Sequence, residues 1–128
     1  MREVQVRTGS GKLGQRIAIG PHELVGDEAR ESEGDDTGPS PHELLLAALG
    51  SCTSMTVKLY ADRKGWPLGG VEVHLTGRPE GGDYLIARTL HLTGDLDDAQ
   101  KERLLEIAEK CPVAKTLRGT IRISTALV

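Results

Sequence analysis

The sequence predicts an α+β fold that forms a single domain over residues 1–128. Segments with strand-like alternation are grouped, and segments with helical spacing lie between the groups instead of following each strand. The chain is long enough for one core, which Leu, Val, Ile and Ala must fill because phenylalanine is absent.

The first group of strands is a predicted hairpin over residues 4–19. Apolar and polar residues alternate on both sides of the Gly-rich turn TGSGKLG, and the following HELVGDE is expected to add a short third strand. Residues 26–40, GDEARESEGDDTGPS, are acidic and rich in Gly and Ser, which predicts a long loop. Loops of this length in small domains are often functional.

A long helix is predicted over residues 41–64. Ser40, Pro41 and Glu43 fit the N-cap, N1 and N3 positions of a capping box, and Gly65 supplies the stop signal. The run LLLAAL near its start is apolar on nearly all sides, which indicates a buried helix. Because a small domain offers little to bury it, we expect a partner subunit and hence a homodimer.

The second half of the chain repeats the grouping. Residues 71–78 and 84–96 alternate around PEGGD and predict a second hairpin. Residues 97–110 have the spacing of an amphipathic helix, CPVAKTL predicts a new short helix, and residues 119–128 predict a closing strand.

Composition excludes several classes of function. The 16 basic and 19 acidic residues give a net charge of −3, and the basic residues are scattered, so no nucleic-acid surface is predicted. No apolar run was expected to approach the roughly 20 residues of a membrane span. The charged, alternating start MREVQVRTG does not resemble a signal peptide. With two cysteines and no secretory signal, we expect a cytoplasmic protein.

The two cysteines lie in different local settings. Cys52 lies in the middle of the long helix, where apolar surroundings favour a packing role, yet its neighbours in SCTSMT are unusually rich in hydroxyl groups. Cys111 precedes Pro112 and can act as the N-cap of a short helix, a position that favours a thiolate. A plain helix break that contains a cysteine is an equal alternative.

Other chemistry is poorly supported. The cysteines lack the C-x-x-C spacing of zinc or thioredoxin-like sites, and His42, His74 and His91 do not fall into ligand spacing. The sequence therefore predicts no metal and no cofactor. The residues alone are compatible with a peroxide-reducing thiol pair or with no thiol chemistry at all.

The stretch GDDTGPSPHELLLAALGSCTSMTVKLYADRKGW, with EKCPVAKTL much later, resembles the OsmC/Ohr family of osmotically inducible and organic-hydroperoxide-resistance proteins, and its OsmC-like branch in particular. The resemblance covers nearly the whole chain. It implies an intertwined homodimer with antiparallel sheet elements around a long central helix, and a thiol peroxidase for organic hydroperoxides. In such an enzyme Cys52 attacks the peroxide and Cys111 forms a disulfide with the resulting sulfenic acid. A dithiol or a lipoyl protein would return the disulfide to the reduced state.

Three further residues follow from the resemblance. The family places a Glu ten residues before the first cysteine, where this chain has His42, with Glu43 one position later. By helical geometry the two positions differ by about 100°, and capping is the simpler role for Glu43. In Ohr-like members of the family, an arginine in the turn of the first hairpin lowers the pKa of the attacking thiol. In this chain Lys12 falls nearest to that place, Arg16 follows soon after, and Arg30 in the loop is a further candidate. Of the three, Arg16 is the predicted counterpart. The alternative function is a non-catalytic protein of the same fold that binds a small lipophilic molecule or senses redox state.

Overall fold

The computed structural model describes residues 1–128 and contains two compact units, residues 1–45 and 46–128. That one domain spans the chain stays a prediction. In chain order the elements are β1 (Val4–Thr8), β2 (Gln15–Ile19), β3 (His22–Gly26), a 3-10 helix (Arg30–Ser32), α1 (Pro41–Lys64), β4 (Leu68–Glu80), β5 (Asp83–Gly94), α2 (Asp98–Glu109) and α3 (Pro112–Arg118). The fold class is α+β, as predicted.

The N-terminal unit is a three-stranded antiparallel sheet in the order β1-β2-β3. Val4 pairs with Ile19 and Thr8 with Gln15, so the predicted hairpin is confirmed and HELVG forms the third strand. Gly11 lies in the first turn at φ 73°, in the left-handed region that glycine adopts without strain.

The long loop after β3 is anchored by the buried carboxylate of Asp27. The backbone N–H groups of Glu28 and Thr37 donate to it at 2.7 and 3.1 Å, and the Thr37 hydroxyl also donates to it. The hydrogen bond from the Thr37 side chain, followed by the one from the Glu28 backbone, lowers the pKa of Asp27 to about 2. These hydrogen bonds therefore connect Thr37, near the end of the loop, to Asp27 at its beginning.

Helix α1 begins and ends where the sequence predicts. The Ser40 N–H donates to Glu43 at 2.8 Å and the Glu43 N–H donates back to Ser40 at 3.2 Å, which confirms the capping box. With a mean hydropathy of 1.4, α1 is long and apolar enough to cross a membrane by length and composition. This finding corrects the expectation that no apolar segment has that length. The core helices of soluble proteins pass the same test.

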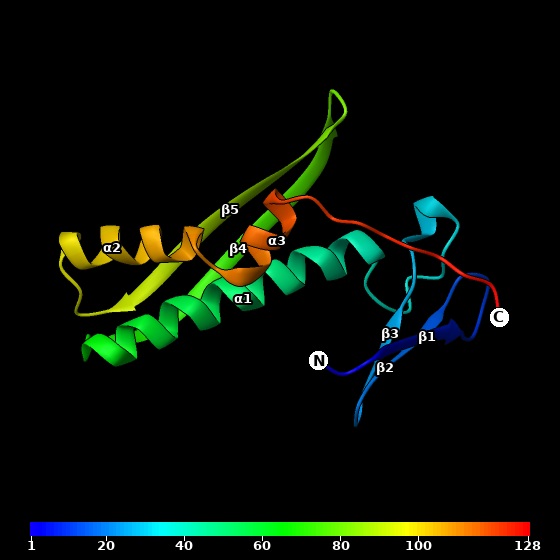
Figure 1. Cartoon of the computed structure of the whole chain (residues 1–128), viewed down its shortest axis with the longest axis horizontal. Coiled ribbons are helices and arrows are strands. Elements are labelled where there is room, and N and C mark those ends of the chain that lie inside the picture. Colours follow the sequence, from blue (N-terminus) through cyan, green and yellow to red (C-terminus); the bar gives the residue numbers. More distant parts are fainter. The chain divides into compact units, whose positions relative to one another are not determined.

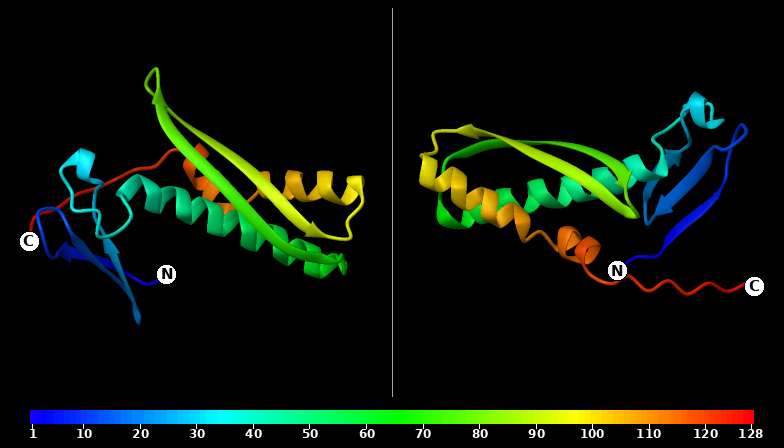
Figure 2. Two further views of the ribbon diagram at one scale, coloured as in Figure 1. Left: turned by 180° about the vertical axis from the view of Figure 1, so that it is seen from behind. Right: turned by 90° about the horizontal axis from the view of Figure 1, so that it is seen from above.

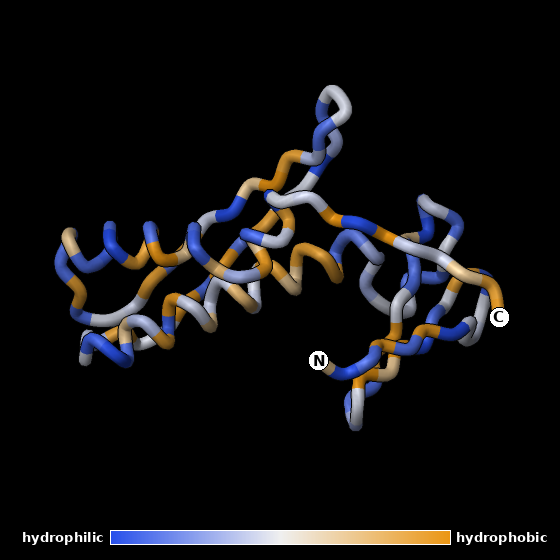
Figure 3. Tube along the Cα trace, viewed as in Figure 1, coloured by the Kyte–Doolittle hydropathy of each residue, from blue (hydrophilic) through white to orange (hydrophobic).

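The C-terminal unit is built on the long hairpin of β4 and β5 (Figures 1 and 2). One face of this hairpin carries four cross-strand pairs that are at least half-buried: Val71 with Leu92, Val73 with Leu90, Leu75 with Arg88, and Gly77 with Ile86. Helices α1 and α2 pack on this face, and Figure 3 shows the hydrophobic residues that run along α1.

Two hydrophobic clusters fill the space between the hairpin and the helices. The first is made of apolar side chains from α1, α2, β4 and the loop after β5: Val57, Ala61, Leu68, Leu96, Leu104 and Ala108. The second consists of Leu49, Cys111 and Ala114, with Cys52, Leu75 and Ile86 among the partly buried side chains against it. Both cysteines therefore belong to one cluster.

The closing strand predicted for residues 119–128 is not formed. Helix α3 ends at Arg118, and the segment after it has no strand pairing within the chain. Its apolar residues Ile121 and Ile123 are 54% and 86% exposed. A strand requires a hydrogen-bonded neighbour, and the segment pairs with neither sheet of this chain.

Candidate active site

The two predicted redox cysteines are brought together in the C-terminal unit. Cys52 projects from the middle of α1 and Cys111 is the N-cap of α3, at φ −64° and ψ 142°. The backbone N–H of Val113, in the first turn of α3, donates to Cys52 Sγ at 3.4 Å. This contact fixes the sulfur of Cys52 beside the residue pair Cys111-Pro112, although the two cysteines are far apart in the sequence.

The surroundings of Cys111 include a buried guanidinium that the sequence analysis did not identify. Arg88, on β5, places Nη1 at 3.7 Å from Cys111 Sγ and donates to Thr53 Oγ1 at 2.8 Å. Its side chain is only 9% exposed. Thr53 Oγ1 lies 3.7 Å from the same sulfur and donates to the Leu49 carbonyl at 2.7 Å. An arginine and a hydroxyl thus face the Cys111 sulfur from two different elements.

The burial and the hydrogen bonds of Cys111 shift the pKa of its thiol. Burial raises the pKa of the Cys111 thiol, because it disfavours the charged form. Hydrogen bonds from the Ala114 backbone, from Thr53, from Cys52 and from Arg88 act in the opposite direction. Together they outweigh the burial, and the pKa of Cys111 lies below its usual value. The pKa of Cys111 is thus shifted in the direction expected for a cysteine at a helix N-cap.

Glu109 holds Arg88 from the other side and is itself held by Arg118. Arg88 Nη2 donates to Glu109 Oε1 at 3.2 Å, and Arg118 pairs with the other oxygen of the same carboxylate. Arg118 also donates to the Glu109 carbonyl at 2.9 Å. The hydrogen bond from Arg118 is the main cause that lowers the pKa of Glu109, and the charge of Arg88 adds to it. Glu109 is therefore a carboxylate at neutral pH.

A cavity of about 310 Å³ adjoins this cluster. Apolar side chains of Leu49, Ile86 and Leu117 line it together with the guanidinium groups of Arg88 and Arg118. An apolar cavity with a few convergent polar groups is the usual form of a small-molecule site.

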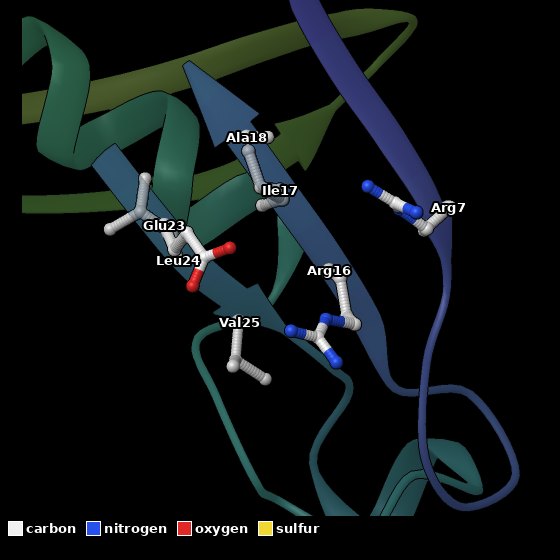
Figure 4. Close-up of a pocket in the computed structure, with 7 residues that line it drawn as sticks. All are labelled: Arg7, Arg16, Ile17, Ala18, Glu23, Leu24 and Val25. Atoms are coloured by element: carbon white, nitrogen blue, oxygen red, sulfur yellow. The ribbon is translucent and has the colours of Figure 1, made fainter. Parts of the chain in front are cut away.

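Arg16, the predicted activating cation, lies in the N-terminal unit. It is on β2 directly opposite Arg7 of β1, and both arginines line a cavity of about 310 Å³ together with Glu23 and Val25 (Figure 4). Like charges placed opposite each other in a sheet repel, so the Arg7–Arg16 pair destabilises the sheet. Arg88, in contrast, lies opposite the apolar residue Leu75. The role of Arg16 toward a thiol stays a prediction.

His42 and Glu43 also lie in the N-terminal unit, in the first turn of α1. The Glu43 carboxylate accepts the Ser40 N–H, and the hydrogen bonds from Ser40 lower the pKa of Glu43. The capping role weighed for Glu43 is thus observed, whereas a catalytic role for either residue stays a prediction. No group of three or more His, Cys, Asp or Glu side chains is placed to hold a metal ion.

Arg88 had a recognisable sequence signal. In the segment YLIARTLHLTGDL the apolar residues Ile86, Leu90 and Leu92 recur at every second position, and Arg88 occupies the missing place in that series. An arginine on the buried face of an alternating strand requires a partner, because an unpaired buried charge is costly. The alternation therefore predicts a partnered Arg88 on the buried face of the second hairpin, and not a cation from the first hairpin.

Most of the chain matches a known protein family. The profile of the OsmC-like protein family matches residues 34–126, which include both cysteines, Arg88 and Glu109. The chain belongs to the OsmC-like protein family. None of the curated protein sequences matches it significantly.

Solved structures of similar proteins show the same fold as this OsmC-like chain. An osmotic stress induced and detoxification response protein from Psychrobacter arcticus has a TM-score of 0.77 at 22% identity, with 91% of this chain and 88% of that one covered. An OsmC-like protein from Mycoplasma pneumoniae has a TM-score of 0.78 at 16% identity, with 93% and 88% covered. The organic hydroperoxide resistance protein OhrB of Bacillus subtilis has a TM-score of 0.61 at 23% identity, with 93% and 91% covered.

Proposed function

We propose that this chain is a thiol peroxidase that reduces organic hydroperoxides through Cys52 and Cys111 in defence against oxidative or osmotic stress. The observation that carries the proposal is the position of both sulfurs in one packed cluster, with the Arg88 guanidinium at 3.7 Å from Cys111 Sγ. Membership of the OsmC-like family, whose structural relatives include organic hydroperoxide resistance proteins, adds support.

In the proposed reaction the Cys52 thiolate attacks the peroxide. The S–O bond forms while the O–O bond breaks, and the alcohol leaves after taking up a proton. Cys52 is the better placed thiol for this step, because it is partly exposed whereas Cys111 is 0% exposed. The apolar lining of the neighbouring cavity suits a peroxide with an organic substituent. A dithiol or a lipoyl protein then reduces the Cys52–Cys111 disulfide.

The proposed assembly is a homodimer. In it, Arg16 would activate the attacking thiol, and His42 and Glu43 would stand in for the glutamate that the family places ten residues before the first cysteine. Exposed apolar side chains favour a second copy of the chain: Met55 and Leu59 on α1 are 70% and 50% exposed. Monomeric proteins rarely leave large contiguous apolar patches uncovered. Light scattering of the purified protein tests this part, and a mass of 13.7 kDa in solution would contradict it.

Thiol counting tests the reaction. The reduced protein receives one equivalent of cumene hydroperoxide, and free thiols are counted in the wild type and in Cys52→Ser. We expect rapid loss of two thiols per chain in the wild type and no loss on that timescale in the variant. A wild type that keeps both thiols for minutes contradicts the proposal and favours the non-catalytic binding function, for which the same cavity would be the site.

A further inference from the structure

The side chains around Cys111 carry an unmatched positive charge. Arg88 and Arg118 contribute two guanidinium groups, and Glu109 contributes the one carboxylate that lies between them. Thr53, a further side chain in contact with the sulfur, is neutral. A Cys111 thiolate would bring this cluster to neutrality, whereas with the protonated thiol two guanidinium groups share a single carboxylate.

Arg88 is in position before any thiolate forms. Its Nη1 is fixed by Thr53 at 2.8 Å and its Nη2 by Glu109 at 3.2 Å, so the two nitrogens are held by groups on α1 and α2. The same Nη1 is 3.7 Å from Cys111 Sγ. Because these contacts hold the guanidinium, little reorganisation is required when negative charge develops on the sulfur.

An external thiol has unequal access to the two sulfurs. Cys111 is 0% exposed, whereas Cys52 is partly exposed. In thiol–disulfide exchange the attacked sulfur is the accessible one, and the reaction is faster when the departing thiol is the more acidic of the pair. The burial of Cys111 and the positive charge beside it therefore favour the same course of reduction, in which the external thiol attacks Cys52 and Cys111 departs.

We infer that Arg88 makes Cys111 the thiolate partner in both halves of the cycle: the nucleophile that closes the Cys52–Cys111 disulfide, and the leaving group when a dithiol reopens it. The inference rests on the peroxidase function proposed above. It assigns to a residue of the second hairpin a role in resolution and in recycling that is separate from the activation of Cys52.

In the oxidative half, the Cys111 thiolate attacks Sγ of the Cys52 sulfenic acid. The S–S bond forms and the S–O bond breaks, and the departing hydroxide takes up a proton and becomes water. Arg88 supports this step because it keeps Cys111 in the nucleophilic form.

In the reductive half, one thiolate of the dithiol attacks Cys52 Sγ. A mixed disulfide forms, the Cys52–Cys111 bond breaks, and Cys111 departs as a thiolate that faces Arg88. The second thiol of the dithiol loses its proton and attacks the mixed disulfide, which releases the Cys52 thiolate and leaves the dithiol oxidised.

The test uses a disulfide that is made without peroxide. The full-length protein is oxidised with diamide, and its reduction by dithiothreitol is followed for the wild type, Arg88→Met, Arg88→Lys and Arg78→Met. Arg78 is a matched control, because it lies on the same hairpin and its side chain is 64% exposed in a pair with Glu80. Circular dichroism verifies that each variant is folded, and Arg88→Lys retains the charge if Arg88→Met does not fold.

We expect Arg88→Met to be reduced roughly tenfold more slowly than the wild type, Arg88→Lys to lie between them, and Arg78→Met to equal the wild type. A tenfold change in the equilibrium with dithiothreitol corresponds to a midpoint potential lower by about 30 mV in Arg88→Met. With glutathione as a single thiol, mass spectrometry of the trapped adduct should find it on Cys52.

Three results would overturn the inference: no disulfide with diamide, an adduct on Cys111, or reduction of Arg88→Met and Arg88→Lys at the wild-type rate. Failure of the peroxidase function gives a different pattern. In that case cumene hydroperoxide leaves the wild-type thiols intact, while the diamide-formed disulfide still shows the dependence on Arg88.

Discussion

Each unit of the molecule contains one charged side chain that is nearly buried: Asp27 in the N-terminal unit and Arg88 in the C-terminal unit. The partners of Asp27, Glu28 and Thr37, lie within ten residues of it along the chain. Arg88 takes its partners from α1, from α2 and from the start of α3.

This difference separates a structural anchor from a site. The donors around Asp27 are neutral and come from Glu28 and Thr37 of one loop, so its contacts are local. Arg88 is held by Thr53 and Glu109 and still directs one nitrogen at a sulfur. A buried charge whose partners include a nucleophile is a stronger indication of function than its burial alone.

The largest effect is expected for Thr53→Val, which removes the hydroxyl that joins Arg88 to Cys111. The side chain is 0% exposed and keeps its shape as valine, but Arg88 loses a hydrogen bond of 2.8 Å inside the unit. We expect the free energy of unfolding to fall by about 1–3 kcal/mol. The pKa of Cys111 should rise, because a group that lowers it is lost.

Urea denaturation measures the first effect, and the ultraviolet absorbance of the thiolate during a pH titration measures the second, in a Cys52→Ser background where Cys111 is the one thiol left. Thr56→Val is the control, since it is the same change on the same helix. If both substitutions shift the titration equally, Thr53 has no special role at the sulfur.

The next largest effect distinguishes the proposed role of Arg16 at Cys52 from that of Arg88 at Cys111. If Arg16 activates Cys52, Arg16→Met should slow the loss of thiols to cumene hydroperoxide about tenfold, which is about 1.4 kcal/mol of barrier. The titration of Cys111 should not change, because the cation in contact with that sulfur is Arg88. Stopped-flow mixing with peroxide provides the rate. Arg7→Met is the matched control, since Arg7 is paired with Arg16 across the sheet.

The sequence was sufficient for most of the fold and for the thiol pair. Local signals determine the long helix, its capping box and the two hairpins, since Ser40 and Glu43 or an alternating strand act over a few residues. The closing strand over 119–128 failed for the opposite reason. Its alternation is real, but a strand also needs a neighbour, which the alternating pattern cannot supply.

The arginine of the site was missed because it depends on tertiary contacts. Thr53, Arg88 and Cys111 are separated by 35 and 23 positions, and neither separation is typical of a motif. The alternation of β5 was sufficient to show that Arg88 faces inward, but only the register with Leu75 and the packing of α1 show that it meets a sulfur.

A smaller effect should appear in the anchor of the loop. Asp27→Asn replaces a carboxylate that accepts from three donors with an amide, and the loop over residues 28–36 should become more sensitive to proteolysis at neutral pH. Because the folded pKa of Asp27, about 2, lies below its usual value of 3.8, the stabilisation is present above pH 3.8 and is lost as the pH falls towards 2. The wild type should thus approach the variant in that range, as hydrogen exchange at the Thr37 amide can show. Glu28→Gln is the control, and equal exchange in both variants would exclude a specific role for Asp27.

The smallest effect, and the sharpest in sign, is expected for Glu109→Gln. Glutamine keeps an oxygen that accepts from Arg88 but removes a negative charge near Cys111, so we expect the pKa of Cys111 to fall further. Since the Glu109 side chain is 57% exposed, solvent screens the change, and we expect an effect on stability of only about 0.2–1 kcal/mol. Thiolate absorbance in the Cys52→Ser background measures the titration, with the exposed Glu106→Gln on the same helix as control. A rise in the pKa would instead mean that Glu109 acts by holding Arg88 in place.

The same pair of proteins should also differ in how their stability depends on pH. Because the folded pKa of Glu109 lies below its usual value of 4.5, the stabilisation by its charge is present above pH 4.5 and is lost as the pH falls below that value. The free energy of unfolding of the wild type should therefore approach that of Glu109→Gln in that range.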